Sequence, residues 1–425
     1  MTPEVRDRID QIRQGIVPEG YKKTKSGILP ESWSVRTIAE CLERVEHPVE
    51  VQANEMYTQI GIRSHGKGLF YKEPVTGDSL GNKSVFWIEP DCFILNIVFA
   101  WEQAIGKTTQ AEAGMIGSHR FPMYRPINGS IDIDYLISYL LTKRGTDILE
   151  AASPGGAGRN RTLGQDRFMK SRIVLPPLDE QKKIAEILST QDKTIELQAR
   201  KIEELKRFKK GCLEKMFPRK GQKVPEKRFP GFTDDWEQRK LTEFVEFFSG
   251  LTYTPNDVQE NGTLVLRSSN VSNGEVVDAD NVYVNPQVVN SENVKVGDIV
   301  VVVRNGSRSL IGKHAQIKAF MPNTVIGAFM TGIRSECPKF TNALLNTSKF
   351  EEEIAMNMGA TINQITGYMF SKMEFKVPCL DEQKEIGEYF ENLDHLITLH
   401  QRKLEEMKKQ KKALMQLLLT GIVRV

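Results

Sequence analysis

Glycine-lysine pairs have the most obvious chemical potential in this sequence, because a glycine-rich loop that ends in lysine and a hydroxyl residue can hold a nucleotide phosphate. The segment IGKTT, residues 105–109, has the right ending, but the first glycine of such a loop should stand at position 101, which is Trp101. Gly68 replaces the hydroxyl residue in GIRSHGKG, residues 61–68, and His314 replaces it in IGKH, residues 311–314. None of the three segments predicts a nucleotide site.

Other catalytic and metal-binding motifs are also missing from the sequence. It has no HExxH or GxGxxG pattern. The six histidines lack ligand spacing, and His395 and His400 are more typical of helix packing or surface. The five cysteines are scattered without CxxC spacing, which argues against both a zinc site and a disulfide framework. The sequence therefore offers no catalytic constellation and no recognisable cofactor or metal site.

Basic and polar loop residues form the pattern that does suit a ligand, and their side chains are of the types that can contact DNA. Arginine and lysine fit guanine edges and phosphates, asparagine fits adenine, and serine and threonine fit either. Surface turns are polar in any case, so each residue alone is weak evidence. The candidate DNA contacts of the first half are Arg63, Ser64, His65, Lys67, Lys107, Thr108, Ser118, His119 and Arg120. Those of the second half are Arg267, Ser268, Asn270, Arg304, Asn305, Ser307, Arg308 and Lys313.

The elements that must position these loops occur twice. LDEQKKIAE begins at Leu178, and LDEQKEIGE begins 202 residues later, at Leu380. At that offset the match continues through both segments, and WSVRTIAE from Trp33 resembles WEQRKLTEF from Trp236. The repeated unit is about half of the chain, which predicts a duplication and excludes a short-period solenoid.

Each copy of LDEQ opens a long amphipathic segment whose apolar residues recur at heptad spacing. Asp179 or Asp381 is the predicted N-cap, and Gly221 and Gly421 are expected to end the helices. We expect the two helices to pair antiparallel within the chain, although a dimerisation coiled coil is an open alternative. The predicted seam residues are Ile184, Leu188, Ile195, Ile202 and Leu205, and Ile386, Phe390, Ile397, Leu404 and Met407.

Two heads are expected beside the helices, because short Val-, Ile- and Phe-rich runs bounded by turn residues are typical of strands, with some helix among them. The predicted class is α+β, with two globular heads in a pseudo-twofold duplication, separated by two long antiparallel coiled-coil helices. The predicted division is a helical N-terminal segment (1–28), first head (29–177), first helix (178–218), basic linker (219–228), second head (229–378) and second helix (379–425).

Composition sets the outer limits of the interpretation. The 425 residues are 40% hydrophobic and 27% charged, which is ordinary for a soluble globular protein. The longest apolar run, residues 92–101, is too short to span a membrane, and the charged N-terminus predicts no secretory signal. We therefore expect a cytoplasmic protein with no membrane partner. The net charge of +3 identifies no ligand, and the basic stretch 206–228 fits either phosphate binding or solvated surface.

The chain resembles the specificity subunit of a type I restriction-modification enzyme over nearly its whole length. The resemblance rests on the starts LPESWSVRTIAE and GFTDDWEQRKLTEF, the Gly-rich head ends GGAGRNRTLGQDRF and MGATINQITGYMF, and, most specifically, the doubled LDEQ helix. It implies that each head is a target recognition domain reading one half of a bipartite DNA site, with the helices as spacer.

The resemblance also implies partners for a non-catalytic chain that chooses the DNA sequence in phage defence. Two modification subunits would bind it and carry S-adenosylmethionine and the adenine-N6 methylation chemistry. Restriction subunits, which use ATP and magnesium, would join them. Two alternatives are a coiled-coil protein-binding scaffold without DNA readout, which would show no salt-dependent duplex affinity, and a methyltransferase that works alone.

Overall fold

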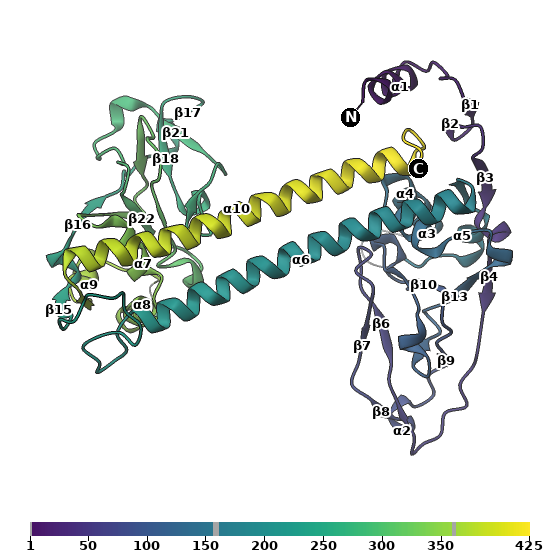
Figure 1. Ribbon diagram of the computed structural model, residues 1–425, viewed down its shortest axis with the longest axis horizontal. Coiled ribbons are helices and arrows are strands. Elements are labelled where there is room, and N and C mark those ends of the chain that lie inside the picture. Colours follow the sequence, from purple (N-terminus) through teal and green to yellow (C-terminus); the bar gives the residue numbers. More distant parts are fainter. Residues whose placement is uncertain (1, 156–160, 359–362) are drawn as a thin grey trace. The chain divides into compact units, whose positions relative to one another are not determined.

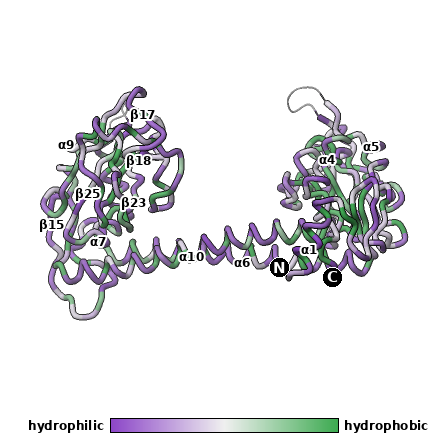
Figure 2. Tube along the Cα trace, turned by 90° about the horizontal axis from the view of Figure 1, so that it is seen from above, coloured by the Kyte–Doolittle hydropathy of each residue, from purple (hydrophilic) through white to green (hydrophobic). Residues whose placement is uncertain are grey.

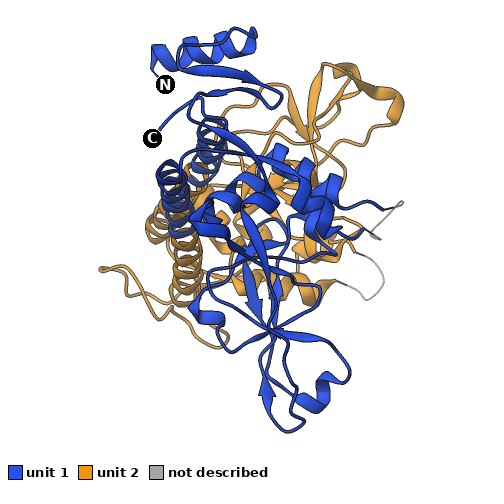
Figure 3. Cartoon of the chain, turned by 90° about the vertical axis from the view of Figure 1, so that its right-hand side faces the viewer, with its two compact units in different colours: residues 1–197, 404–425 blue, residues 198–403 orange. Residues whose placement is uncertain are grey.

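Two compact units make up the chain. The computed structural model describes residues 2–155, 161–358 and 363–425. Residues 1–197 and 404–425 form the first unit, and residues 198–403 form the second (Figure 3). Each unit contains one β-rich head and parts of two long helices (Figure 1), so the predicted α+β class is confirmed. The Gly-rich head ends quoted above include residues 156–160 and 359–362, which lie outside the described residues.

A four-stranded antiparallel sheet, in the order β11-β10-β13-β4, forms the centre of the first head. Its strand β10 (Phe93–Leu95) comes from the longest apolar run and is fully buried, because sheet neighbours and helices cover it. The other strands are β3 (Ser34–Thr37), β4 (Leu42–Val45), β5 (Met56–Tyr57), β6 (Ile60–Ile62), β7 (Leu69–Tyr71), β8 (Val75–Thr76), β9 (Val85–Trp87), β11 (Ile105–Lys107), β12 (Ile116–Ser118), β13 (Met123–Pro126) and β14 (Arg172–Leu175). The helices are α2 (Gly77–Leu80), α3 (Ile133–Leu140), α4 (Lys143–Ala152) and α5 (Gln165–Lys170).

The second head has a matching antiparallel sheet, in the order β16-β25-β22-β23, and a second sheet, β17-β21-β18-β24, in which β18 and β24 run parallel. Its strands are β15 (Glu237–Lys240), β16 (Val245–Ser249), β17 (Val258–Gln259), β18 (Thr263–Leu266), β19 (Val271–Ser272), β20 (Glu275–Val276), β21 (Val282–Val284), β22 (Ile299–Val302), β23 (His314–Gln316), β24 (Thr324–Ile326), β25 (Met330–Ser335) and β26 (Glu374–Val377). Its helices are α7 (Pro338–Leu345), α8 (Ser348–Asn357) and α9 (Gly367–Phe370).

The two longest helices are α6 (Leu178–Met216) and α10 (Leu380–Leu419), of 39 and 40 residues. In the first unit, Leu188 near the start of α6 shares a core with Leu418 at the end of α10. In the second unit the roles are exchanged, since Phe390 near the start of α10 shares a core with Leu213 near the end of α6. The start of each helix thus packs against the end of the other, which confirms the antiparallel pair.

Burial along the predicted seam varies from residue to residue. Ile184, Leu188, Ile202, Ile386, Phe390 and Ile397 are buried, whereas Ile195, Leu205, Leu404 and Met407 are only half-buried. Figure 2 shows the alternation of hydrophobic and hydrophilic residues along α6 and α10, in contrast to the largely hydrophobic interiors of the heads. The predicted seam therefore does face inward, and its half-buried residues lie among buried ones, as Ile195 and Leu205 do on either side of Ile202.

Both helices start one residue earlier than the predicted N-caps. The Pro177 carbonyl accepts the first helical bond, from the Gln181 N–H at 3.0 Å, so Asp179 lies inside the first turn and is not the cap. Asp381 has the same place in α10. Both carboxylates still lie at the positive end of a helix dipole, which is where anions stabilise a helix. Helix α6 also ends at Met216, before the expected Gly221.

The first 30 residues form a small layer of their own within the first unit. Helix α1 (Pro3–Arg13), capped by Thr2, covers only part of the segment 1–28 that was expected to be helical. The hairpin of β1 (Tyr21–Thr24) and β2 (Gly27–Pro30), closed by Gly27 at a φ of 108°, was not predicted.

Candidate nucleic-acid interface

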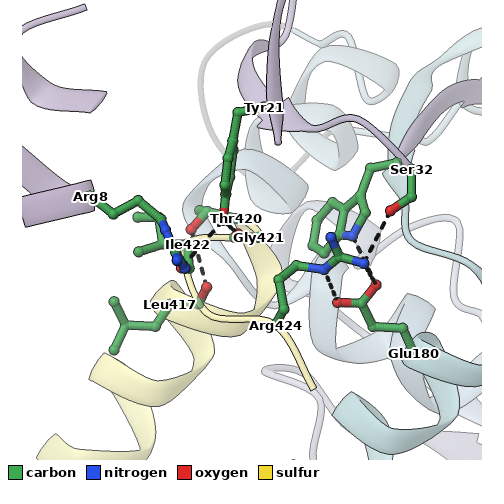
Figure 4. A network of polar contacts seen from close by, with 10 residues as sticks. Arg8, Tyr21, Ser32, Glu180, Leu417, Thr420, Gly421, Ile422 and Arg424 are labelled. Atoms are coloured by element: carbon green, nitrogen blue, oxygen red, sulfur yellow. Dashed lines mark hydrogen bonds and ion pairs between the residues drawn. The ribbon is translucent and has the colours of Figure 1, made fainter. Parts of the chain in front are cut away.

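The doubled LDEQ motif fixes the start of each long helix to its own unit. Glu180 is 5% exposed and receives two hydrogen bonds from Arg424, at 2.5 and 2.9 Å, and one from the Trp33 indole at 3.1 Å (Figure 4). Glu382 is fully buried and receives two from Arg228, at 2.7 and 2.8 Å. These bidentate pairs satisfy carboxylates that would otherwise be costly to bury. The repeated acids therefore have a structural use in both copies.

The glutamine of each motif has an equally local function. The Gln181 side chain donates to the Pro176 carbonyl at 2.9 Å, and the Gln383 side chain donates to the Pro378 carbonyl at the same distance. In each copy a buried carbonyl before the helix thus gains the donor it needs.

The C-terminal residues close the first unit against the N-terminal layer. Tyr21 donates to the Gly421 carbonyl at 2.6 Å, and Arg8 donates to the Ile422 carbonyl at 2.6 Å (Figure 4). Gly421, at a φ of 74°, turns the chain away from α10, and Pro30 packs so closely on it that a side chain would not fit. The N-terminal segment therefore packs at the end of α10.

The first head carries an exposed candidate cation beside a short hairpin. Arg63 follows β6, and its guanidinium lies 5.1 Å from the centre of the Phe70 ring on β7. One of its nitrogens donates to the Leu69 carbonyl at 2.5 Å. Such stacking holds the planar group in one orientation and leaves its remaining donors for a ligand. His65 and Lys67, in the left-handed turn that follows, are exposed as well.

The other candidates of the first head fall into two groups. Ser118 is half-buried, and His119 and Arg120 are exposed at the turn after β12. Lys107 is engaged by Asp134, with 2.7 Å between the ammonium and the carboxylate. Ser64 is similarly held by Glu102 at 3.1 Å.

Thr108 is a wrong prediction, because its side chain is fully buried. Its hydroxyl donates to the Glu89 carbonyl at 2.6 Å and accepts from the Cys92 N–H at 2.9 Å. Thr108 therefore holds the loop before β10 and has no surface with which to meet DNA.

The second head brings together candidates that are far apart in the sequence. The Asn305 side chain donates to the Ser268 hydroxyl at 3.2 Å, and these residues follow β22 and β18 respectively. Arg304 is exposed, and its guanidinium lies 5.1 Å from the centre of the Phe329 ring, which is 57% exposed. Ser307 and Arg308 are exposed in the same loop as Arg304, and Lys313 beyond them is half-buried.

Asn270 is the second wrong prediction. It is fully buried, accepts from the Arg267 N–H at 2.9 Å and donates to the Ala279 carbonyl at 2.7 Å. Arg267 is itself only half-exposed, with one nitrogen donating to the Asp280 carbonyl at 2.5 Å. Both side chains shape the loop after β18, and Asn270 cannot contact a ligand without unfolding it.

Aromatic partners were the part of the site that sequence reasoning missed. Neither Phe70 nor Phe329 was among the predicted site residues. The available signal for Phe70 was its place in the basic, Gly-rich segment that also holds Arg63 and Lys67.

Within the described part of the chain, no cluster of three or more potential metal-binding side chains occurs. The helices found there also include none that is long and apolar enough to cross a bilayer.

The comparison with protein families gives a match on both halves. Residues 84–207 and 233–409 match the family model described as the type I restriction modification DNA specificity domain. A similar protein is the type I restriction enzyme MjaVIII specificity subunit of Methanocaldococcus jannaschii, which is 26% identical over 97% of this chain and 98% of that one. The EcoKI specificity subunit of Escherichia coli is 26% identical over 45% of this chain and 43% of that protein.

Solved structures agree at the level of fold. A chain from a study of complex assembly and conformational transition in a type I R-M system aligns with a TM-score of 0.58, at 17% identity, over 93% of this chain and 99% of that chain. The type I S subunit from M. genitalium aligns with a TM-score of 0.56, at 15% identity, over 91% and 96%. The chain belongs to the family of DNA specificity subunits of type I restriction-modification systems.

Proposed function

We propose that each head reads one half of a bipartite, asymmetric site in double-stranded DNA, and that α6 and α10 fix the spacing between the halves. The observation that carries the proposal is one repeated helical frame holding two heads whose exposed polar loops differ. A frame that repeats while its loops diverge suits one task performed on two different sequences. The polar loops supply donors of the kinds that read base edges and phosphates.

The contact surface of each head is proposed to centre on one stacked arginine. Arg63 over Phe70 in the first head and Arg304 over Phe329 in the second combine an exposed guanidinium with an aromatic ring. A guanidinium held in one orientation suits bidentate recognition of guanine or phosphate. The further proposed contacts are His65, Lys67, His119 and Arg120 in the first head, and Asn305, Ser307, Arg308 and Lys313 in the second.

The partners are proposed to be two modification subunits bound to this chain and restriction subunits that join them. In type I systems the catalytic activities reside on these partner subunits, which use S-adenosylmethionine and ATP. We propose that the ATP is bound together with magnesium. The chain would then act in the cytoplasm, where it selects the DNA sequence on which its partners act.

The test is to map the methylated adenines made by the complex of this chain with its modification subunits. Arg63→Ala should relax or abolish recognition of one half-site only, and Arg304→Ala should affect only the other. Lys206→Ala, at an exposed position of α6, is the matched control and should leave the motif unchanged. If both head variants alter recognition of the same half-site, the proposal that each head reads a different half-site is wrong.

The spacing between the two half-sites can be tested separately. Helix α6 has 39 residues and is therefore about 58 Å long at about 1.5 Å per residue, which is close to the length of about 17 base pairs. Inserting four residues into α6 near Glu203 should change the accepted gap or abolish binding, without changing either half-site. Unchanged spacing would count against the helices as a ruler.

A further inference from the structure

Two grooves occupy corresponding places in the two units. The first groove has a volume of about 560 Å³ and lies between the turn from α3 to α4 and the last turns of α10. The second has a volume of about 210 Å³ and lies between the turn from α7 to α8, the end of α6 and the strands β15 and β26. Each groove is formed by residues of one unit alone.

The correspondence extends to individual residues. Thr142 and Thr347 are the N-caps of α4 and α8, and their hydroxyls donate to the carbonyls of Tyr139 and Leu344, at 2.7 and 2.6 Å. All four residues line the grooves. On the helix side, Leu419 of the first groove stands 202 residues after Phe217 of the second, the offset of the LDEQ repeat. The grooves are therefore part of the repeated frame, unlike the loops that differ between the heads.

Both grooves combine apolar walls with basic rims. Leu141 and Met415 are half-buried in the first groove, whose cations are Lys143, Arg144 and Lys412. No acidic side chain lines it, and Lys143 pairs with Asp147 beside it. In the second groove, Phe375 and Leu344 are apolar. Its cations are Arg219, Lys220, Lys349 and Lys376, and its lining acid is Glu374. Two of these cations also pair with acids beside the groove, Arg219 with Glu226 and Lys349 with Glu353.

We propose that each groove docks an acidic protein segment that also presents apolar side chains, and that two copies of one partner chain supply the two segments. Apolar walls favour burial of hydrophobic groups, and the excess of rim cations favours carboxylates. Two grooves of one frame fit two copies of one partner. The inference rests on the proposed function, in which two modification subunits bind this chain, and it assigns them a docking site. Duplex DNA would use the cations but leave the apolar walls uncovered.

Charge reversal of cations at the groove rims tests the proposed docking. The experiment uses the full-length chain and separately purified modification subunits. Lys143→Glu with Lys412→Glu should weaken binding at the first groove by at least about tenfold, and Arg219→Glu with Lys220→Glu should do the same at the second. Native mass spectrometry should then show one bound copy for either pair and none for the four changes together. Lys403→Glu is the control, because residue 403 is exposed and lies nine residues before Lys412, on the opposite side of α10.

A photo-crosslinking residue at Gln416, exposed at the first groove, identifies the occupant directly. It should capture a segment of the modification subunit rich in Asp and Glu. Two bound copies in every charge variant, or crosslinking to DNA, would overturn the groove assignment while leaving the proposed function intact. If the unaltered chain binds no modification subunit, both proposals fail together. Circular dichroism of each variant separates loss of docking from loss of fold.

Discussion

The Lys209 ammonium on α6 lies 2.6 Å from the Asp394 carboxylate on α10. At the offset of 202 residues, Lys209 corresponds to Lys411, and Asp192 corresponds to Asp394. Lys411 and Asp192 form a second pair at 2.5 Å, in the first unit. In the pair of the second unit, α6 supplies the lysine and α10 the aspartate, whereas in the pair of the first unit α10 supplies the lysine and α6 the aspartate. Two copies of one helix that pair antiparallel are expected to show this exchange. The same relation holds for Gln198 and His400, which correspond to each other and are joined by a hydrogen bond at 2.9 Å.

The two ion pairs should differ in their contribution to the free energy of unfolding. The side chains of Lys209 and Asp394 are only 13% and 27% exposed, so Asp394→Ala should leave a poorly solvated ammonium and cost about 1–2 kcal/mol. Asp192 is 57% exposed, so Asp192→Ala should cost less than about 1 kcal/mol. Urea unfolding of both variants measures the difference. Equal costs would show that burial does not separate the pairs.

The C-terminal Arg424 should stabilise the first unit through Glu180. Arg424→Ala removes two hydrogen bonds and leaves a carboxylate that is 5% exposed, with the Trp33 indole as its one remaining side-chain donor among the described residues, at an expected cost of about 2–3 kcal/mol. Arg424→Lys restores the charge but not the bidentate geometry, so it should recover part of that loss. Thermal unfolding followed by tryptophan fluorescence provides the measurement. An unchanged midpoint in Arg424→Ala would show that this ion pair does not hold the C-terminal tail.

Stability of the second unit should depend on pH through His314. Burial lowers the pKa of its imidazole from the usual 6.5, and Lys209 adds to this effect while Asp394 opposes it. The ring donates to the Gly312 carbonyl at 2.9 Å and accepts from the Asn346 amide at 3.1 Å, a pattern that requires the neutral form.

Because the unfolded chain binds the proton more tightly, this contribution to stability is complete above pH 6.5. It is lost as pH falls from 6.5 toward the lowered pKa. Urea unfolding between pH 7.5 and 5 should therefore show a steeper loss of stability for the unaltered chain than for His314→Gln. Parallel curves for the two proteins would contradict a depressed pKa.

Much of the frame was predictable because it depends on local patterns. Heptad spacing predicted α6 and α10, and runs such as those of β10 and β22 have the Val, Ile and Phe content that favours buried strands. The duplication predicted the antiparallel pair, since two like seams in one chain can cover each other. The N-caps were missed by two residues. The carbonyls that accept the first helical bonds belong to Pro177 and Cys379, and residue type alone does not show which carbonyl takes this place.

The candidate site was less predictable, because residue type does not reveal burial. Thr108 and Asn270 belong to polar loop segments that look like ligand surfaces, yet tertiary packing turns both side chains inward. The contact of Asn305 with Ser268 joins residues 37 positions apart and depends on the neighbouring strands. Arg63 and Arg304 were found from their type alone, whereas the rings that hold them could be assigned only from the fold.

Substitution of Arg304 should affect DNA binding, whereas substitution of Asn270 should affect stability. Arg304 is exposed, and Asn270 is buried and holds the loop after β18. Arg304→Ala should leave the unfolding midpoint nearly unchanged. If Arg304 contacts a phosphate, this variant should weaken DNA binding and reduce the slope of log affinity against log salt concentration by about one. If Arg304 contacts a base, the variant should weaken binding by about 1–3 kcal/mol in a way that depends on the DNA sequence. Asn270→Ala removes buried hydrogen bonds to the Arg267 N–H and the Ala279 carbonyl and should destabilise the second unit by about 2–3 kcal/mol.

Fluorescence anisotropy with a labelled duplex at several salt concentrations, beside urea unfolding of the same samples, separates the two effects. Below the unfolding transition, Asn270→Ala should keep the salt slope of the unaltered chain, because a buried amide releases no counterions from DNA. Thr108→Val is the matching variant of the first head and should behave like Asn270→Ala, with a smaller cost of about 1–2 kcal/mol. A changed salt slope in either buried variant, with stability intact, would place these side chains at the DNA surface after all.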